Sequence, residues 1–213
     1  MILGLGAGSS DHFHENEEKS YGFPFPKAAV RLYQLQEYIE VIRQMWATDE
    51  ATYNGRYYHV SRAKCLPKPI QKPGPPIIVA GSGKKFLKIA VDLADGYNYW
   101  GTKDEYAKRT TMLDDLCKSS RRDPSSLEKS WHISAVIEGA SDQLKKRPSY
   151  HRQRDIIGEP MFGDAPSDWV QPLTDYTQLS VSSFQVWFLD GVLEPLKLFA
   201  REVIPKLKGM LVG

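Results

Sequence analysis

The chain has 213 residues, of which 41% are hydrophobic and 25% are charged, and its formal net charge is +2 at pH 7. This composition is ordinary for a globular protein and excludes a dedicated nucleic-acid binder, which carries a strong basic excess. The apolar runs are too short to cross a bilayer, and no segment reads as a signal peptide. Cys65 and Cys117 lie outside any paired motif, as is usual in a reducing compartment. We therefore expect a cytoplasmic protein with no membrane or nucleic-acid partner.

An apolar segment that ends in glycines opens the sequence. Residues 1–6 read Met-Ile-Leu-Gly-Leu-Gly and are followed by Ala7, Gly8 and Ser9. This pattern predicts a buried strand of a parallel sheet, with a backbone-lined loop at its carboxyl end. Because such strands normally have neighbours on both sides, we expect the chain to form the later part of a larger α/β domain.

A helix, a hairpin and an extended connector are predicted next. Apolar residues recur at helical spacing over residues 27–48. Asn54 and Gly55 separate two short β-prone runs, and this pair is typical of a two-residue type I′ turn in a separate hairpin. Five prolines within residues 67–76 predict an extended connector.

After the connector, strand and helix signals alternate. Thr102 and Glu105 form a capping box, which predicts the start of a helix, whereas Pro172 lies inside a weaker helical segment. Residues 143–163 show no regular pattern. Strands that are each followed by a helix imply parallel pairing, and we expect the first and last strands to be the edges of the sheet. The predicted later strands are residues 77–80, 95–100, 131–137 and 183–188, and the predicted helices are residues 84–93, 102–118, 166–178 and 193–207.

Two glycine loops that follow predicted strands are the candidate ligand-binding segments. The first contains Ala7, Gly8 and Ser9, and the second contains residues 80–83. In parallel α/β folds, ligands bind at the carboxyl ends of strands, where glycines let backbone N–H groups approach a phosphate. A pair of lysines after the second loop adds positive charge. The pattern favours a phosphate-bearing cofactor, and ordinary tight turns between strand and helix are the alternative.

Other potential sites are weaker. His12 and His14 have a spacing that metal ligands use, but they lie in a loop-like segment without a third ligand, so no metal site is predicted. Tyr97, Tyr99 and Trp100 fit either core packing or a wall against a planar ligand. No nucleophile, catalytic triad or Walker loop is visible, so the sequence assigns no catalytic residue.

Several motifs, in order along the chain, resemble the bacterial luciferase-like monooxygenases. They include Leu-Gly-Leu-Gly-Ala-Gly at residues 3–8 and Ile-Ile-Val-Ala-Gly-Ser-Gly at residues 77–83. The resemblance covers most of the sequence and is weakest across residues 143–163. The other motifs that carry it are residues 21–26, 55–58, 66–73, 75–76, 94–102 and 122–124.

The resemblance implies a (β/α)8 TIM barrel that uses FMN or the deazaflavin coenzyme F420. It places residues 1–6 at the fourth strand and residues 183–188 at the eighth, so residues 1–213 form a single incomplete barrel domain with about five parallel strands and outer helices. Residues 98–102 are more similar to deazaflavin-dependent members. The cofactor contacts of the family fall on Ala7, Gly8, Ser9, Ala80, Gly81, Ser82 and Gly83.

The sequence therefore predicts a flavin- or deazaflavin-dependent oxidoreductase or monooxygenase of the luciferase-like class, incomplete as given, that acts on a small molecule. In such enzymes the cofactor carries the reactive chemistry, which explains the lack of a visible triad. Two alternatives stay open: a non-catalytic flavin-binding or self-assembling remnant, and a truncated product without function. Apolar edge strands also predict a homo-oligomer, because unpaired strands invite association.

Overall fold

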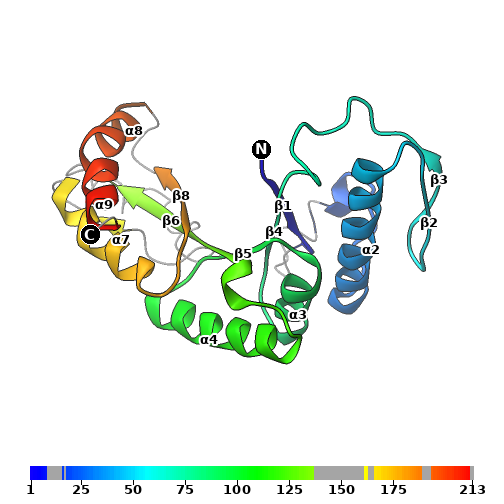
Figure 1. The fold of residues 1–213 in the computed structure, drawn as a ribbon, viewed down its shortest axis with the longest axis horizontal. Coiled ribbons are helices and arrows are strands. Elements are labelled where there is room, and N and C mark those ends of the chain that lie inside the picture. Colours follow the sequence, from blue (N-terminus) through cyan, green and yellow to red (C-terminus); the bar gives the residue numbers. More distant parts are fainter. Residues whose placement is uncertain (9–15, 17, 137–160, 163–165, 189–192, 212–213) are drawn as a thin grey trace. The chain divides into compact units, whose positions relative to one another are not determined.

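The computed structural model describes residues 1–8, 16, 18–136, 161–162, 166–188 and 193–211 (Figure 1). The chain divides into two compact units. It crosses between them within strand β5 (Gly96–Tyr99), within helix α4 (Lys103–Ser119) and after Leu127. The first unit comprises Met1–Tyr97 and Asp115–Leu127, and the second comprises Asn98–Asp114 and Glu128–Gly213.

Two parallel strands of the first unit, β1 (Leu3–Gly6) and β4 (Ile77–Ala80), lie side by side. In their register, Leu3 pairs with Ile77 and Gly6 pairs with Ala80, so the two strands end at the same height in the sheet. Ile77 and Val79 are fully buried, as an uninterrupted apolar strand predicts. Helix α3 (Lys84–Leu93) follows β4 and has the bounds predicted from the sequence.

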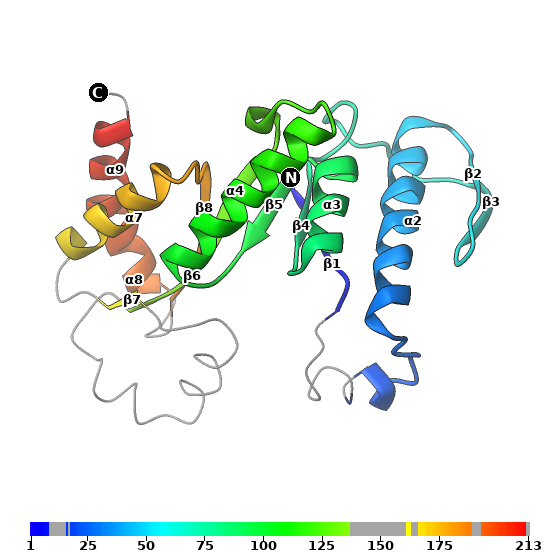
Figure 2. The ribbon, with the colours of Figure 1, turned by 90° about the horizontal axis from the view of Figure 1, so that it is seen from below.

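Helix α2 (Ala28–Ala47) follows β1, and a hairpin of β2 (Ala51–Asn54) and β3 (His59–Ala63) stands beside it (Figures 1 and 2). The hairpin forms its own antiparallel two-stranded sheet, as expected. The helix buries Leu35 and Ile39 completely, in agreement with its apolar periodicity.

The prediction of a two-residue type I′ turn at Asn54 and Gly55 is wrong. The first strand ends at Asn54 and the second begins at His59, so a longer loop connects them. The carboxylate of Glu37 on α2 accepts hydrogen bonds from three successive N–H groups of this loop, at residues 56–58, over 2.8, 2.8 and 2.9 Å. A tertiary contact with the helix therefore sets the connection, in place of the local preference of the Asn-Gly pair.

The second unit contains parallel strands β6 (Glu128–Val136) and β8 (Ser183–Phe188), which pair along most of their length. A further short strand, β7 (Met161–Phe162), pairs in parallel with the end of β6. It lies inside the segment for which the sequence predicts no regular structure, and that expectation is corrected at these two positions. A strand of this length is too short for a periodic pattern, so only its pairing partner defines it.

Helix α4 begins at the predicted capping box. The N–H of Thr102 donates to Oε2 of Glu105 over 2.9 Å, and the N–H of Glu105 donates to Oγ1 of Thr102 over 3.3 Å. Pro172 is tolerated because it lies in the first turn of α7 (Val170–Thr177), where a backbone N–H has no helical partner. The remaining helical elements are η1 (Pro124–Ser126), η2 (Pro166–Trp169), α8 (Leu193–Leu198), the π-helical η3 (Phe199–Val203) and α9 (Ile204–Leu211).

The strand order confirms the predicted fold class. Strands β1, β4, β5 and β6 follow one another in the sheet, and β8 pairs with β6. Five parallel strands in chain order, with helices between them, match part of a (β/α)8 barrel. Among the described residues, β1 and β8 each have one neighbouring strand, as predicted, but so does β7, which the expectation of two edges did not include.

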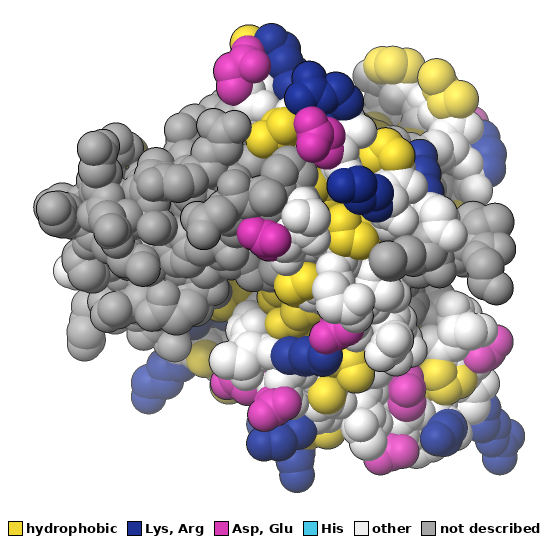
Figure 3. All heavy atoms as spheres, turned by 90° about the vertical axis from the view of Figure 1, so that its left-hand side faces the viewer, with side chains coloured by type: hydrophobic (Ala, Val, Ile, Leu, Met, Phe, Trp, Pro, Cys, Tyr) yellow, Lys and Arg dark blue, Asp and Glu magenta, His cyan; other side chains and the backbone are white. Residues whose placement is uncertain are grey.

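The described part of the surface carries charges of both signs. On the face drawn in Figure 3, Lys and Arg side chains are interspersed with Asp and Glu. This distribution agrees with the small net charge of +2. Among the helices that the structure describes, none is both long enough and apolar enough to cross a membrane.

Candidate functional site

The two predicted glycine loops lie on adjacent strand ends in the first unit. The final residues of β1 and β4 pair in register. Ala7 and Gly8 continue from one strand, and residues 81–83 continue from Ala80 at the end of the other. The structure thus sets the predicted residues of both loops at the same edge of the sheet, apart from Ser9, which lies outside the described residues.

Gly83 begins helix α3 in a conformation that suits a ligand. Its φ of +93° lies in the left-handed region, and a Cβ atom there would meet no other atom within 4 Å. Gly83 is the N-cap of α3, and because it has no side chain it cannot cap the first N–H groups of the helix. The first turn of the helix also holds no acidic residue. Ser82, Lys84 and Lys85 are exposed beside it. Free N–H groups, the helix dipole and two lysines make this turn a fitting place for a phosphate.

Gly81 is a glycine for a different reason. A Cβ atom on this residue would lie 2.6 Å from Cε2 of Phe86, which is buried on α3. The hydroxyl of Tyr97 donates to the carbonyl oxygen of Gly81 over 2.7 Å. The ring centroid of Tyr97 lies 6.4 Å from that of Phe86. Packing against this aromatic pair therefore requires the glycine. It also places Tyr97 in the core, so the alternative of a ligand wall does not hold for that residue.

Two side chains of α2 hold the first glycine loop. The hydroxyl of Tyr38 donates to the carbonyl oxygen of Gly6 over 2.6 Å, and Nε of Arg31 donates to that of Ala7 over 2.7 Å. Burial, and to a smaller extent a neighbouring tyrosine, raises the pKa of Tyr38 to about 12, so its hydroxyl stays protonated and can donate. Sequence reasoning missed both residues, although they lie seven positions apart on one face of the helix.

One face of β1 presents bare backbone. Gly4 and Gly6 are exposed on this face, because alternate residues of a strand point to the same side. A Cβ atom on Gly4 would meet nothing within 4 Å, and one on Gly6 would meet only the carbonyl oxygen of Ala80, at 3.4 Å. This strand therefore leaves open space on the face that carries Gly4 and Gly6.

The second unit has a polar band on one face of β6. Nδ2 of Asn98 donates to Oγ of Ser130 over 2.9 Å, and both residues are buried. His132 shares that face with Ser130 and pairs in register with Gln185. Burial lowers the pKa of His132, so the imidazole is neutral at pH 7. The ring of Trp187 lies edge-on to it, with centroids 6.5 Å apart.

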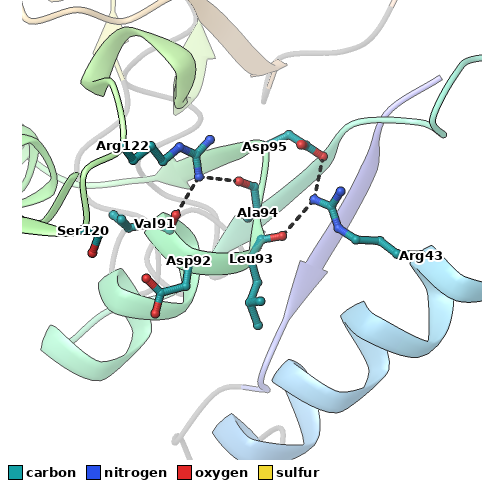
Figure 4. Close-up of a pocket in the computed structure, with 8 residues that line it drawn as sticks. All are labelled: Arg43, Val91, Asp92, Leu93, Ala94, Asp95, Ser120 and Arg122. Atoms are coloured by element: carbon teal, nitrogen blue, oxygen red, sulfur yellow. Dashed lines mark hydrogen bonds and ion pairs between the residues drawn. The ribbon is translucent and has the colours of Figure 1, made fainter. Parts of the chain in front are cut away.

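A pocket of about 590 Å³ lies at the opposite end of the first unit's strands, and two arginines dominate it (Figure 4). Nη1 of Arg122 donates to the carbonyl oxygens of Val91 and Ala94 over 2.7 and 2.8 Å. Nη2 of Arg43 donates to that of Leu93 over 2.8 Å. Both guanidinium groups thus satisfy carbonyls at the end of α3, where a helix leaves its last carbonyls without partners.

The same pocket contains a carboxylate that ties α2 to the sheet. Oδ2 of Asp95 accepts from Arg43 over 3.1 Å and from the N–H of Ile77 over 2.8 Å. Asp95 directly precedes β5 and Ile77 begins β4, so both residues lie at the amino ends of these strands. In parallel α/β folds that end contributes to stability, whereas the carboxyl end binds ligands. We therefore interpret the arginine pocket as structural.

The weak metal-ligand pattern receives no structural test, because His12 and His14 lie outside the described residues. Within the ranges that the structure does describe, no group of three or more His, Cys, Asp or Glu side chains is placed to hold a metal ion.

Solved structures share the fold of most of this chain. An F420-dependent secondary alcohol dehydrogenase, solved with an F420-acetone adduct, matches with a TM-score of 0.77 and 19% identity over 97% of this chain and 69% of its own. A riboflavin lyase solved with modified FMN matches with a TM-score of 0.73 and 12% identity over 93% of this chain and 62% of its own. At these identities the likeness concerns the fold alone.

A curated relative is closer in sequence. The F420-dependent glucose-6-phosphate dehydrogenase of Microbacterium testaceum is 32% identical over 125 residues, which are 57% of this chain and 35% of that protein. The match thus spans about a third of the relative's length. The family model of luciferase-like monooxygenases matches residues 1–171. On this evidence, which confirms the resemblance seen in the motifs, the chain belongs to the luciferase-like monooxygenase family.

Proposed function

We propose that this chain binds the phosphate end of the cofactor in an oxidoreductase that uses coenzyme F420 or FMN. The observation that carries the proposal is the level ending of β1 and β4, which sets Gly8 and Gly83 on adjacent strand ends, both at positive φ. Such glycine loops expose backbone N–H groups to an anion. Membership of the luciferase-like family supports the same assignment.

F420 is the cofactor that we favour. The relative from Microbacterium testaceum is named as F420-dependent, and so is the solved secondary alcohol dehydrogenase. FMN is the alternative, supported by the riboflavin lyase that shares the fold. Both cofactors carry a phosphate and a flat ring system, so the glycine face of β1 and the start of α3 suit either one.

The cofactor supplies the hydride or oxygen chemistry when it is bound, and the protein supplies binding and orientation. In this chain, the free N–H groups at the start of α3 bind the phosphate, together with the backbone of Gly83 and the hydroxyl of Ser82. Lys84 and Lys85 draw the anion to this turn through their charge. Gly4 and Gly6 leave room for the ring.

Both units belong to one barrel domain, residues 1–213, in this proposal. Support comes from the family match, which runs over residues 1–171 and so includes parts of both units. The proposal includes a small-molecule substrate, a cytoplasmic location and self-association through the edge of β1.

Equilibrium titration of F420 and of FMN, followed by fluorescence, tests the proposal. Gly83→Ala should weaken binding about fivefold to tenfold, since the methyl group displaces the anion from one N–H group. Gly22→Ala is the matched control, because Gly22 also has a positive φ, of +77°, and open space around it, yet belongs to neither glycine loop. Both variants should lose similar thermal stability, and only the first should lose affinity.

The contribution of the two lysine charges to cofactor binding is tested separately by the same titration. The double variant Lys84→Gln, Lys85→Gln should weaken binding about tenfold and reduce its dependence on salt. Lys88→Gln is the control, because Lys88 lies on the same helix and pairs with Asp92. Failure of the unmodified protein to bind either cofactor would overturn the proposal. Binding without turnover would favour the non-catalytic alternative.

A further inference from the structure

We infer that Arg31 is a positioning residue for cofactor binding, which acts through the peptide that joins Ala7 to Gly8. The inference rests on the proposed function of the glycine loops. Its starting point is the 2.7 Å hydrogen bond from Nε of Arg31 to the carbonyl oxygen of Ala7. Because the donor is charged, this bond is stronger than an ordinary backbone contact.

Arg31 is itself fixed from two sides. Its Nη1 donates to the carbonyl oxygen of Pro26 over 2.6 Å, and its guanidinium lies 4.1 Å from the ring centroid of Phe25. Both partners belong to the proline-flanked segment that leads into α2. A guanidinium that is stacked on a ring and bonded at two nitrogens has little rotational freedom, so it holds the Ala7 carbonyl in one direction.

The direction of that carbonyl decides where the next N–H points. Among the described residues, the cis peptide bonds precede Pro67 and Pro73, so the bond between Ala7 and Gly8 is trans. In a trans peptide the carbonyl and the N–H point in opposite directions. The carbonyl of Ala7 points to Arg31, and the N–H of Gly8 therefore points away from α2, where a ligand can receive it.

Gly8 completes this arrangement. Its φ is +77°, and a Cβ atom there would lie 3.4 Å from Cε2 of Phe25 and 3.5 Å from Nε of Arg31. The stacked pair of Phe25 and Arg31 thus covers one side of Gly8, which is otherwise an exposed residue. Without the arginine, the peptide is free to rotate, and its N–H no longer has a fixed direction.

A second side chain of α2 supports the preceding residue. The hydroxyl of Tyr38 donates to the carbonyl oxygen of Gly6, and its ring meets that of Tyr58 edge-on, with centroids 6.1 Å apart. The N–H of Tyr58 in turn donates to Glu37 over 2.9 Å. Two successive carbonyls at the end of β1, those of Gly6 and Ala7, are thereby held by one helix.

Arg31→Met and Arg43→Met are a matched pair for testing this role. Both arginines lie on α2, and both donate to a backbone carbonyl, but Arg43 does so at Leu93, away from the glycine loops. We expect Arg31→Met to weaken F420 and FMN binding about tenfold, and Arg43→Met to leave it unchanged, at similar losses of thermal stability. Arg31→Lys, which keeps the charge and one donor group, should restore part of the affinity.

Backbone order measured by NMR relaxation provides a readout that needs no cofactor. The amide order parameter of Gly8 should be lower in Arg31→Met than in the unmodified protein or in Arg43→Met. Equal order parameters and equal affinity in the two variants would overturn the positioning role, and so would equal losses of affinity in both. If the unmodified protein binds neither cofactor, the proposed function fails, and the order parameter still decides whether Arg31 orders the peptide at Gly8.

Discussion

Phe86 lies so close over Gly81 that a Cβ atom on the glycine would be 2.6 Å from Cε2 of the ring. Real side chains do not approach to this distance, so the ring or the strand end must move. Because Phe86 is 3% exposed and packs with Tyr97, the displacement costs packing on both. We expect Gly81→Ala to lower the free energy of unfolding by about 1–3 kcal/mol, measured by urea denaturation.

Gly4→Ala is the control for this substitution, because Gly4 lies on the neighbouring strand and a Cβ atom there meets nothing within 4 Å. Phe86→Leu, combined with Gly81→Ala, should recover part of the loss, since the smaller side chain leaves room for the methyl group. A stability of Gly81→Ala equal to that of the unmodified protein would contradict the packing explanation. If a Gly81 variant binds the cofactor more weakly, the cause can therefore be distortion of the end of β4 as well as direct obstruction of the phosphate by the new side chain.

The sequence predicted best those elements that local pattern and glycine punctuation define together. Helix α3 has its predicted bounds, and the capping box of Thr102 and Glu105 starts α4 as expected. The strand order also follows from the alternation of strands and helices. In each case, the information lies within a few residues of the element itself.

Contacts between distant residues were not predictable in this way. The hairpin loop is set by Glu37, which lies on the preceding helix, and β7 exists only through its pairing with β6. Arg31 and Tyr38 contact carbonyls that are 24 and 32 positions away in the chain. The glycine pattern identified the candidate loops, but it could not separate Gly81, which packing requires, from Gly83, which has open space around it.

The carboxylate of Glu37 should stabilise the hairpin loop in a pH-dependent manner. Burial acts to raise the pKa of Glu37, but the N–H groups of residues 56–58 outweigh it and hold the pKa below its usual value. A carboxyl group with a lowered pKa stabilises the fold above its unfolded pKa, about 4.3, and this contribution is lost as the pH falls through the folded pKa. Glu37→Gln should lower Tm at pH 7, and the difference should shrink below about pH 4.

Thermal unfolding between pH 3 and pH 7 measures this effect. Glu40→Gln is the control, because Glu40 lies on the same helix and accepts a hydrogen bond from the side chain of Tyr53, over 2.9 Å, and not from the loop N–H groups that Glu37 holds. This control should not release the loop at residues 56–58. A difference between Glu37→Gln and the unmodified protein that stays constant down to pH 3 would show that the ionised carboxylate is not the stabilising form.

The edge strand β1 should make the isolated chain associate. Among the described residues, β1 pairs on one side only, and Ile2 beside it is 57% exposed. Neither Lys nor Pro, which discourage edge pairing, occurs in the strand. We expect sedimentation velocity at micromolar concentration to show dimers or larger species, and Ile2→Lys to shift the chain towards the monomer. A stable monomer in the unmodified protein would contradict this prediction.

His132 should make the stability of the protein fall in mild acid. Burial lowers its pKa below the ordinary value of 6.5. Below that pH the unfolded state binds a proton that the folded state resists, so stability decreases from about pH 6.5 down to the folded pKa, by at most about 1.4 kcal/mol per pH unit.

His132→Gln removes this titration, and the free energy of unfolding in urea should then depend less on pH between 7.5 and 5.5. Parallel pH profiles for His132→Gln and the unmodified protein would show that protonation of His132 does not oppose folding.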